Sequence, residues 1–277
     1  MRAVSFFAAL LLLLPAVAFA GDVSAPLHVQ QKHIEMLYPT VLVRANQGTG
    51  SGTIIFSEQL DGEYVSLVLT NHHVVKSNIK VSEEWDSHAQ EKIERETRRP
   101  VLIDLWEYNH FSDAIGTIGR QATIEAWDKD RDLALLRVVD SERPLPFVAE
   151  LYPENEDDGP WIFQQVFAVG AGLGKPPFPT AGLLSGFGRD KNGRALYLAS
   201  APTIFGNSGG ALFVYSPRDS FQLIGVPSML SAFGWGSSVV THMGWSRPIS
   251  EIRIFLRAND FGFVLGDPEE PIAVEDN

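Results

Sequence analysis

Short apolar runs, each bounded by glycine, proline or polar turn residues, recur along this 277-residue chain. One set comprises residues 41–44, 52–56 and 64–69, and a later set comprises residues 166–169, 195–199, 211–214 and 221–226. Asp61-Gly62 separates two neighbouring runs and is a strong signal for a tight hairpin turn. Short strands at regular spacing are typical of antiparallel barrels and sandwiches. The sequence therefore predicts an all-β fold.

The region between the two sets of strands indicates a linker. Residues 141–160 contain several prolines and the acidic run 154–158, a composition that favours an irregular connection. We therefore expect one strand-rich unit over residues 36–140 and a second over residues 161–257.

Two further segments depart from the strand pattern. Residues 82–99 are highly charged and rich in helix formers, which predicts an exposed helix or an insertion that Pro100 ends. Apolar residues at helical spacing within 249–258 predict a closing helix. Residues 258–277 then form an acidic C-terminal tail.

The first twenty residues resemble an export signal. Arg2 precedes an apolar run over residues 3–20 that ends in Ala18-Phe19-Ala20. A basic start, an apolar middle and a small-x-small end are typical of a secretory signal peptide over residues 1–20. An uncleaved membrane anchor is the alternative, although Pro15 interrupts the run. We expect this segment to be cleaved off. The mature protein should then be periplasmic or extracellular, with no stable membrane insertion.

Charge and cysteine content exclude several classes of function. The formal net charge is −12, and such a surface repels phosphate backbones, so we expect no nucleic-acid partner. The chain has no cysteine, which removes disulfides, thiol nucleophiles and cysteine-based metal sites. Histidines lack partners at metal-ligand spacing, and the glycine-rich stretch 170–175 lacks the spacing of a phosphate-binding loop. We expect no metal and no cofactor.

Gly206-Asn207-Ser208-Gly209-Gly210 places one serine on a turn bounded by glycines. Glycines allow the backbone to bend tightly and leave neighbouring N–H groups free to face a substrate carbonyl oxygen. Serine in such a frame is a candidate nucleophile, but glycine-serine turns are also common in ordinary loops. The stretch alone does not decide between these interpretations.

A candidate base and a candidate acid precede this serine. Histidines occupy positions 72 and 73, and aspartates occupy positions 128, 130 and 132. Only Asp132 directly precedes the apolar run 133–136, whereas spacing cannot decide between His72 and His73. The order His-Asp-Ser differs from that of α/β-hydrolases, which share the Gly-x-Ser-x-Gly pattern but place acid and histidine after the serine.

Together, the motifs at 70–75 (TNHHVV), 132–138 (DLALLRV) and 206–212 (GNSGGAL) resemble those of trypsin-like serine proteases, most similarly the bacterial HtrA/Deg type. The glycine-rich stretches 48–52 and 182–186 fit the same type, and the resemblance covers residues 39–256. It implies two six-stranded antiparallel β-barrels packed face to face, with a short C-terminal helix, in one protease domain over residues 21–257. Such proteins usually add a PDZ domain, which we do not expect here because only the tail follows.

The resemblance also implies a role for each site residue. The family pattern Thr-Asn-x-His selects His73 as the general base, with Asp132 orienting it and Ser208 as nucleophile. Backbone amides of the segment Gly206, Asn207 and Ser208 form the oxyanion hole, with the N–H groups of Gly206 and Ser208 as donors. The implied activity is that of an exported serine endopeptidase acting on polypeptides through an acyl-enzyme. Oligomer formation is compatible with the sequence.

By the same resemblance, uncharged residues surround the pocket for the side chain that precedes the scissile bond. Its walls and floor are assigned to Pro202, Thr203, Ser228, Met229, Leu230 and Gly244. A charged side chain would be desolvated there without a partner, at a cost of several kcal/mol. We therefore expect cleavage after small or medium apolar residues.

A protease-like module that binds proteins without cleaving them is the alternative function. The complete His-Asp-Ser set argues against it, because a fold kept only for binding does not need all three residues. Reaction of Ser208 with a serine-directed reagent distinguishes the two functions.

Overall fold

The computed structural model describes residues 27–86, 90–109, 111–139, 142–154, 159–233 and 238–268. The export signal expected over residues 1–20 and residues 269–277 of the tail lie outside these residues. Within them, no helix is both long and apolar enough to cross a membrane.

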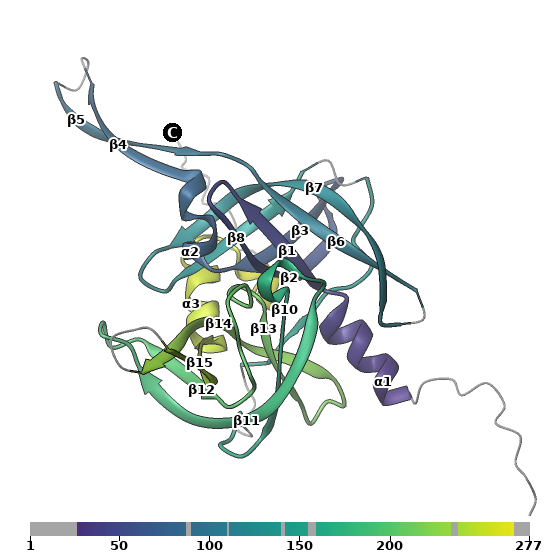
Figure 1. Ribbon diagram of the computed structural model, residues 1–277. Coiled ribbons are helices and arrows are strands. Elements are labelled where there is room, and N and C mark those ends of the chain that lie inside the picture. Colours follow the sequence, from purple (N-terminus) through teal and green to yellow (C-terminus); the bar gives the residue numbers. More distant parts are fainter. Residues whose placement is uncertain are drawn as a thin grey trace, which may run out of the picture.

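Six antiparallel strands close into the first barrel, in the order β1-β2-β3-β8-β7-β6 (Figure 1). Their bounds are β1 Thr40–Ala45, β2 Gly48–Leu60, β3 Glu63–Thr70, β6 Val101–Asn109, β7 Asp113–Asp128 and β8 Leu133–Val138. Leu60 pairs with Glu63 across the turn at Asp61-Gly62, where both residues have positive φ. This confirms the predicted hairpin, since such a backbone matches the twist of the flanking strands.

The second barrel closes in the order β13-β10-β11-β12-β15-β14, with β14 pairing back onto β13. Its strands are β10 Gln165–Gly170, β11 Phe178–Arg189, β12 Ala195–Ala199, β13 Ala211–Tyr215, β14 Phe221–Phe233 and β15 Ser238–Pro248. The prediction of two six-stranded antiparallel barrels is confirmed. Within the segment expected as a linker, β9 (Glu150–Leu151) pairs in parallel with β14.

Alternation along the strands divides the apolar residues between two cores. In β3, Val68 packs inside the first barrel, whereas Leu67 and Leu69 belong to a cluster that continues into the second barrel. That cluster also contains Ile252 and Phe255 of α3 (Ile249–Arg257), the predicted closing helix. Strands buried on both faces explain the nearly continuous apolar runs of the first barrel, and the shared cluster fixes one barrel against the other.

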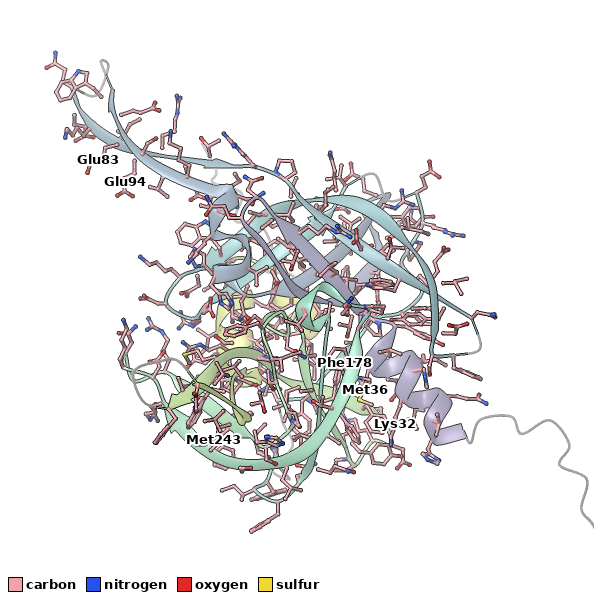
Figure 2. All side chains as sticks on the ribbon, in the orientation of Figure 1. Lys32, Met36, Glu83, Glu94, Phe178 and Met243 are labelled. Atoms are coloured by element: carbon pink, nitrogen blue, oxygen red, sulfur yellow. The ribbon has the colours of Figure 1, made fainter. Side chains whose placement is uncertain are left out.

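Residues 82–86 and 90–99 are not helical, so the helix alternative was wrong. They form most of a hairpin of β4 (Ile79–Asp86) and β5 (Glu91–Arg98) that projects from the first barrel (Figure 1). Lys92 pairs with Glu83 across the strands at 3.1 Å, so a highly charged segment is also compatible with a two-stranded antiparallel hairpin. Glu83 and Glu94 are directly opposed and lie clear of both barrels (Figure 2), which is unfavourable for like charges.

The remaining short helical elements precede the first barrel, join successive strands or follow α3. They are α1 Leu27–Lys32, η1 His33–Leu37, α2 His72–Val75, η2 Lys76–Asn78, η3 Gly172–Gly174 and η4 Gly262–Leu265. Of these, α2 and η3 lie next to the residues predicted to form the active site. The glycine-rich stretch containing η3 connects β10 to β11, as expected for an inter-strand loop.

Candidate active site

His73 and Asp132 meet where α2 follows the end of β3. Both carboxylate oxygens of Asp132 lie close to Nδ1 of His73, Oδ2 at 2.8 Å and Oδ1 at 3.0 Å. The backbone N–H of His73 also donates to Oδ1, at 2.9 Å. A carboxylate on Nδ1 favours the tautomer in which Nε2 is free to accept a proton. The geometry therefore orients the imidazole of His73 for the role of a base.

Asp132 is held in place by further contacts. Its φ is +54°, a left-handed backbone conformation that is uncommon outside glycine. Its carbonyl accepts a hydrogen bond from Nδ2 of Asn71 at 2.7 Å, and Ser228 donates its hydroxyl to Oδ2 at 2.5 Å. Burial acts to raise the pKa of Asp132, but the hydrogen bond and charge of His73 and the Ser228 hydroxyl together lower it. The carboxylate is thus kept ionised beside the imidazole.

The neighbouring histidine and aspartates make other contacts. The ring of His72 stacks on Trp127 with centroids 5.1 Å apart, and burial is the main reason that the pKa of His72 is lowered. Asp128 accepts the backbone N–H groups of its own turn, at 2.7 and 2.8 Å. Asp130 pairs with Arg194 at 2.9 Å. Of these two histidines and three aspartates, the structure brings His73 and Asp132 together.

Glycines around Ser208 are required by close backbone approach. Gly209 has a φ of +86°, and a Cβ there would lie 2.1 Å from the carbonyl oxygen of Ser51. Gly206 has a φ of +96°, and a Cβ there would lie 2.6 Å from the backbone nitrogen of Leu173. Both positions therefore exclude larger residues on two grounds, backbone conformation and space.

The backbone N–H groups of residues 206–208 differ in whether they already donate a hydrogen bond within the protein. Asn207 donates its N–H to the carbonyl of Ile204 at 3.1 Å, so within this segment the N–H of Asn207 is already engaged. For the N–H groups of Gly206 and Ser208, the described part of the chain supplies no hydrogen-bond acceptor. Two free donors separated by one residue suit an oxygen that gains negative charge.

One hydrogen bond fixes the direction of the Gly206 N–H. The carbonyl of Phe205 belongs to the same peptide unit and accepts the N–H of Leu173 at 2.9 Å. In a planar trans peptide the C=O and N–H point in opposite directions. The loop at Leu173 therefore turns the Gly206 N–H away from itself.

Ser51 ties the loops on either side of the site, a role that the sequence interpretation missed. It is fully buried, and its hydroxyl donates to the carbonyl of Gly206 at 2.6 Å while accepting the N–H of Ala171 at 2.7 Å. Its backbone N–H donates to the carbonyl of Ser208 at 2.7 Å. The only sequence signal was its place within the glycine-rich stretch 48–52.

A hollow of about 290 Å³ contains both His73 and Ser208 in its lining, together with Phe205, Gly206 and Lys76. The imidazole of His73 is 38% exposed, so a substrate can reach it. Across the described segments, no group of acidic and histidine side chains could hold a metal ion.

The residues predicted to form the specificity pocket lie on neighbouring segments, with Leu230 of β14 paired to Gly244 of β15. Thr203 lies against Gly244, because a Cβ on Gly244 would meet the Thr203 hydroxyl at 2.9 Å. Thr180 donates to the carbonyl of the adjoining Pro202 at 2.7 Å. Met229 and Leu230 also line a hollow that contains Lys129 but neither His73 nor Ser208. The hydroxyl of Ser228 is engaged by Asp132 and is not available to a substrate.

Comparisons with known proteins agree with this fold. A family model described as trypsin-like peptidase domain matches residues 50–226. A search of curated proteins found no match to the sequence. The HtrA-type protease AlgW with a tripeptide is similar at 19% identity and a TM-score of 0.57, over 86% of this chain and 64% of that one.

Two further solved structures give similar values. A serine-to-alanine variant of AlgW with a tripeptide has 19% identity and a TM-score of 0.57, over 84% of this chain and 63% of that chain. The serine endoprotease from Yersinia pestis has 18% identity and a TM-score of 0.52, over 88% of this chain and 69% of its own. The chain thus spans less than two thirds of the length of AlgW. With most of both barrels inside the matched region, the chain belongs to the trypsin-like peptidase domain family.

Proposed function

We propose that this protein is a serine endopeptidase in which Ser208 attacks the peptide carbonyl, His73 accepts the serine proton and Asp132 orients His73. The observation that carries the proposal is the carboxylate of Asp132 on Nδ1 of His73, in a hollow that His73 shares with Ser208. The free N–H groups of Gly206 and Ser208 on the same turn supply the oxyanion hole.

The reaction follows from these positions. Ser208 Oγ bonds to the carbonyl carbon while its proton passes to Nε2 of His73, and the carbonyl oxygen becomes an oxyanion held by the two N–H groups. The C–N bond then breaks, and the leaving amine takes the proton from His73. Water, deprotonated by His73 in turn, then bonds to the acyl carbon, and the Oγ–C bond breaks as His73 returns the proton to Ser208. Asp132 stays ionised throughout and stabilises the imidazolium.

We propose that the substrate binds in an extended conformation beside β14. That strand pairs with β15 along residues 225–233, whereas its pairing with β13 ends at Gly225. Past Pro227, which accepts the N–H of Gly209, the second edge is open among the described residues. An unpaired strand edge next to the reacting serine can add a substrate strand through backbone hydrogen bonds.

For the residue that precedes the scissile bond we propose a small or medium apolar side chain. The adjoining Thr203 and Gly244 are uncharged, so a charged side chain there would lose hydration without gaining a partner. We also propose export of the protein, with removal of residues 1–20, on the sequence pattern alone. The mass of the mature protein secreted from its own cells tests the cleavage.

Reaction with a fluorophosphonate probe, followed by peptide mapping, tests the nucleophile. The expected adduct lies on Ser208 and is absent from Ser208→Ala, which should lose about 10⁶ in kcat if the three residues act as a unit. A Ser185→Ala variant, altered at an exposed serine outside the site, is the matched control. A folded protein that neither reacts nor cleaves any peptide in a library would favour the non-cleaving alternative.

A further inference from the structure

A second hollow, of about 780 Å³, lies on the Asp132 side of the site and has a cationic lining. Four of its side chains are cationic and two are carboxylates: Lys129, Arg189, Lys191, Arg247, Asp130 and Asp190. Both carboxylates already have arginine partners, Arg194 for Asp130 at 2.9 Å and Arg247 for Asp190 at 2.7 Å. In a chain of net charge −12, this concentration of positive charge is unusual.

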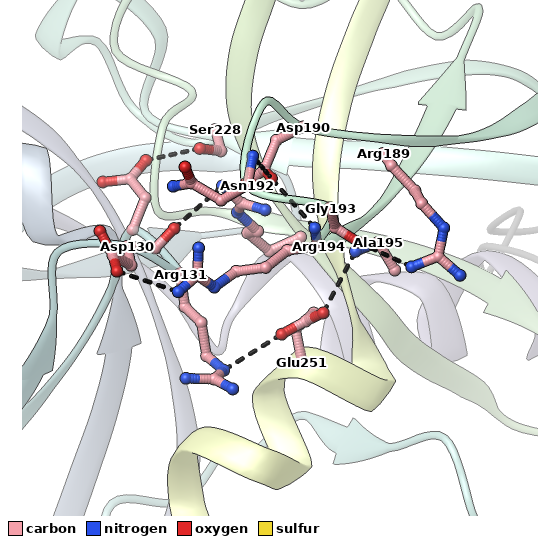
Figure 3. Close-up of polar contacts among 12 residues, drawn as sticks. Asp130, Arg131, Arg189, Asp190, Asn192, Gly193, Arg194, Ala195, Ser228 and Glu251 are labelled. Carbon is pink, nitrogen blue, oxygen red and sulfur yellow. Dashed lines mark hydrogen bonds and ion pairs between the residues drawn. The ribbon is translucent and has the colours of Figure 1, made fainter.

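The hollow is built where the two barrels meet. Lys129 and Asp130 belong to the turn before Asp132 in the first barrel, while Arg189 ends β11 and residues 190–192 belong to the turn between β11 and β12 in the second. Arg131 crosses to Glu251 of α3 at 3.1 Å, and Glu251 in turn accepts the N–H of Ala195 (Figure 3). These contacts hold both turns in place, so the cations belong to a defined site.

Arg247, which lines this hollow, has buried N–H groups that find no hydrogen-bond acceptor among the described residues. The residue is only 4% exposed, and its Nη2 contacts Asp190 and, at 3.3 Å, the carbonyl of Asp130. Its Nε and Nη1 have no acceptor among the described residues. Buried guanidinium N–H groups without acceptors cost free energy, and they add positive charge at the base of the hollow that favours a carboxylate. Lys129 and Lys191 are exposed and have no ion-pair partner in the same part of the chain.

The position of the hollow fits a substrate that extends from the active site. Met229 and Leu230 line it, and they directly follow Ser228, whose hydroxyl reaches Asp132. An extended chain advances about 3.3 Å per residue, so a peptide along β14 reaches the hollow about two to four residues from the scissile bond. Met229 is 39% exposed and offers an apolar wall for the methylene groups of the incoming side chain.

We propose that this hollow binds a carboxylate side chain, Glu or Asp, two to four residues away from the scissile bond of the substrate. The proposal rests on the endopeptidase function and deepens it, because it makes acidic segments of polypeptides the preferred substrates. The carboxylate contacts the ammonium groups of Lys129 and Lys191 at the rim of the hollow, and Arg247 at its base adds positive charge.

Matched peptides carrying either Glu or Gln at each of four positions on both sides of the scissile bond test the proposal. Binding is measured by fluorescence anisotropy on Ser208→Ala protein, and kcat/KM on the unsubstituted enzyme. We expect Glu to improve both roughly tenfold at one or two positions, since hydrogen bonds to charged groups are worth about that much. The advantage should shrink as the salt concentration rises.

Lys129→Gln with Lys191→Gln should reduce the Glu advantage to about twofold, while Lys80→Gln on the exposed hairpin should preserve it. Equal binding of Glu and Gln peptides at every position would overturn the proposal, as would an advantage that the double variant leaves intact. If the enzyme cleaves none of the peptides, the endopeptidase function fails. The binding ratio on Ser208→Ala protein still decides the carboxylate site in that case.

Discussion

Gly206→Ala tests whether the oxyanion hole depends on the peptide unit between residues 205 and 206. Gly206 has a φ of +96°, which costs a residue with a side chain about 1–3 kcal/mol. A Cβ there would also lie 2.6 Å from the backbone nitrogen of Leu173 and 3.0 Å from the carbonyl oxygen of Ala171. These neighbours are backbone atoms and cannot move aside as a side chain could.

The most direct relief is rotation of this peptide unit, and rotation removes the catalytic donor. Phe205 would lose the N–H of Leu173, and the Gly206 N–H would turn away from the substrate carbonyl. One lost oxyanion donor costs about 2.7–4 kcal/mol in the barrier, or about 10² to 10³ in kcat. We expect this loss in kcat with KM little changed, and a free energy of unfolding lowered by about 1–3 kcal/mol.

Gly62→Ala is the matched control, because Gly62 has a φ of +89° but no atom within 4 Å of its added Cβ. It carries the same backbone cost in the β2–β3 turn without a clash near the site. Both variants are measured by steady-state cleavage of one peptide and by urea unfolding, the latter on the Ser208→Ala background. A folded Gly206→Ala enzyme with kcat close to that of the parent would refute this account of the oxyanion hole.

Three further predictions concern His73, Asp132 and their neighbours. His73→Ala should lose activity about as completely as Ser208→Ala, whereas His72→Ala should lose only the ring stacking, about 0.5–1.5 kcal/mol of stability; equal loss of cleavage would sink the assignment of the base. Ser228→Ala removes a donor to Asp132 and should lower kcat more than KM rises; an unchanged kcat would contradict a positioning role. The lowered pKa of Asp132 means that its ionised form stabilises the fold above the unfolded value, about 3.9, and that this contribution is lost as pH falls through the lower folded value. Urea unfolding of Ser208→Ala protein from about pH 6 to about pH 2 should therefore show a difference from its Asp132→Asn derivative that shrinks below about pH 4, and a constant difference would contradict the shift.

Local sequence determined the strand pattern and several turns because the signals lie within a few residues of one another. Asp61-Gly62 adopts positive φ where the hairpin requires it, and apolar residues at helical spacing produce α3 at the predicted place. The same local reading failed for residues 82–99. Their charges suit a helix surface, but they suit a two-stranded ladder equally well, and composition alone does not distinguish the two.

The motif around Ser208 and the order His-Asp-Ser were sufficient for the family and for both barrels. They could not choose between His72 and His73 from spacing alone, since that choice depends on which ring faces the turn after β7. Nor could they show that the Asn207 N–H is engaged by Ile204. The first outcome depends on how distant parts of the chain pack together, whereas the second is a local turn whose hydrogen bond joins residues three apart.

Tertiary structure alone decided which distant residues serve the site. Ser51, Leu173 and Ser228 are remote from one another in sequence, and closure of the two barrels brings each against a different part of the candidate active site. Register sets these contacts, because a shift of one residue along any strand turns its side chains to the opposite face. The cationic hollow has the same origin: its charges come from turns of both barrels. The sequence by itself determined which chemistry was available, and only the packing of one barrel against the other determined where that chemistry is assembled.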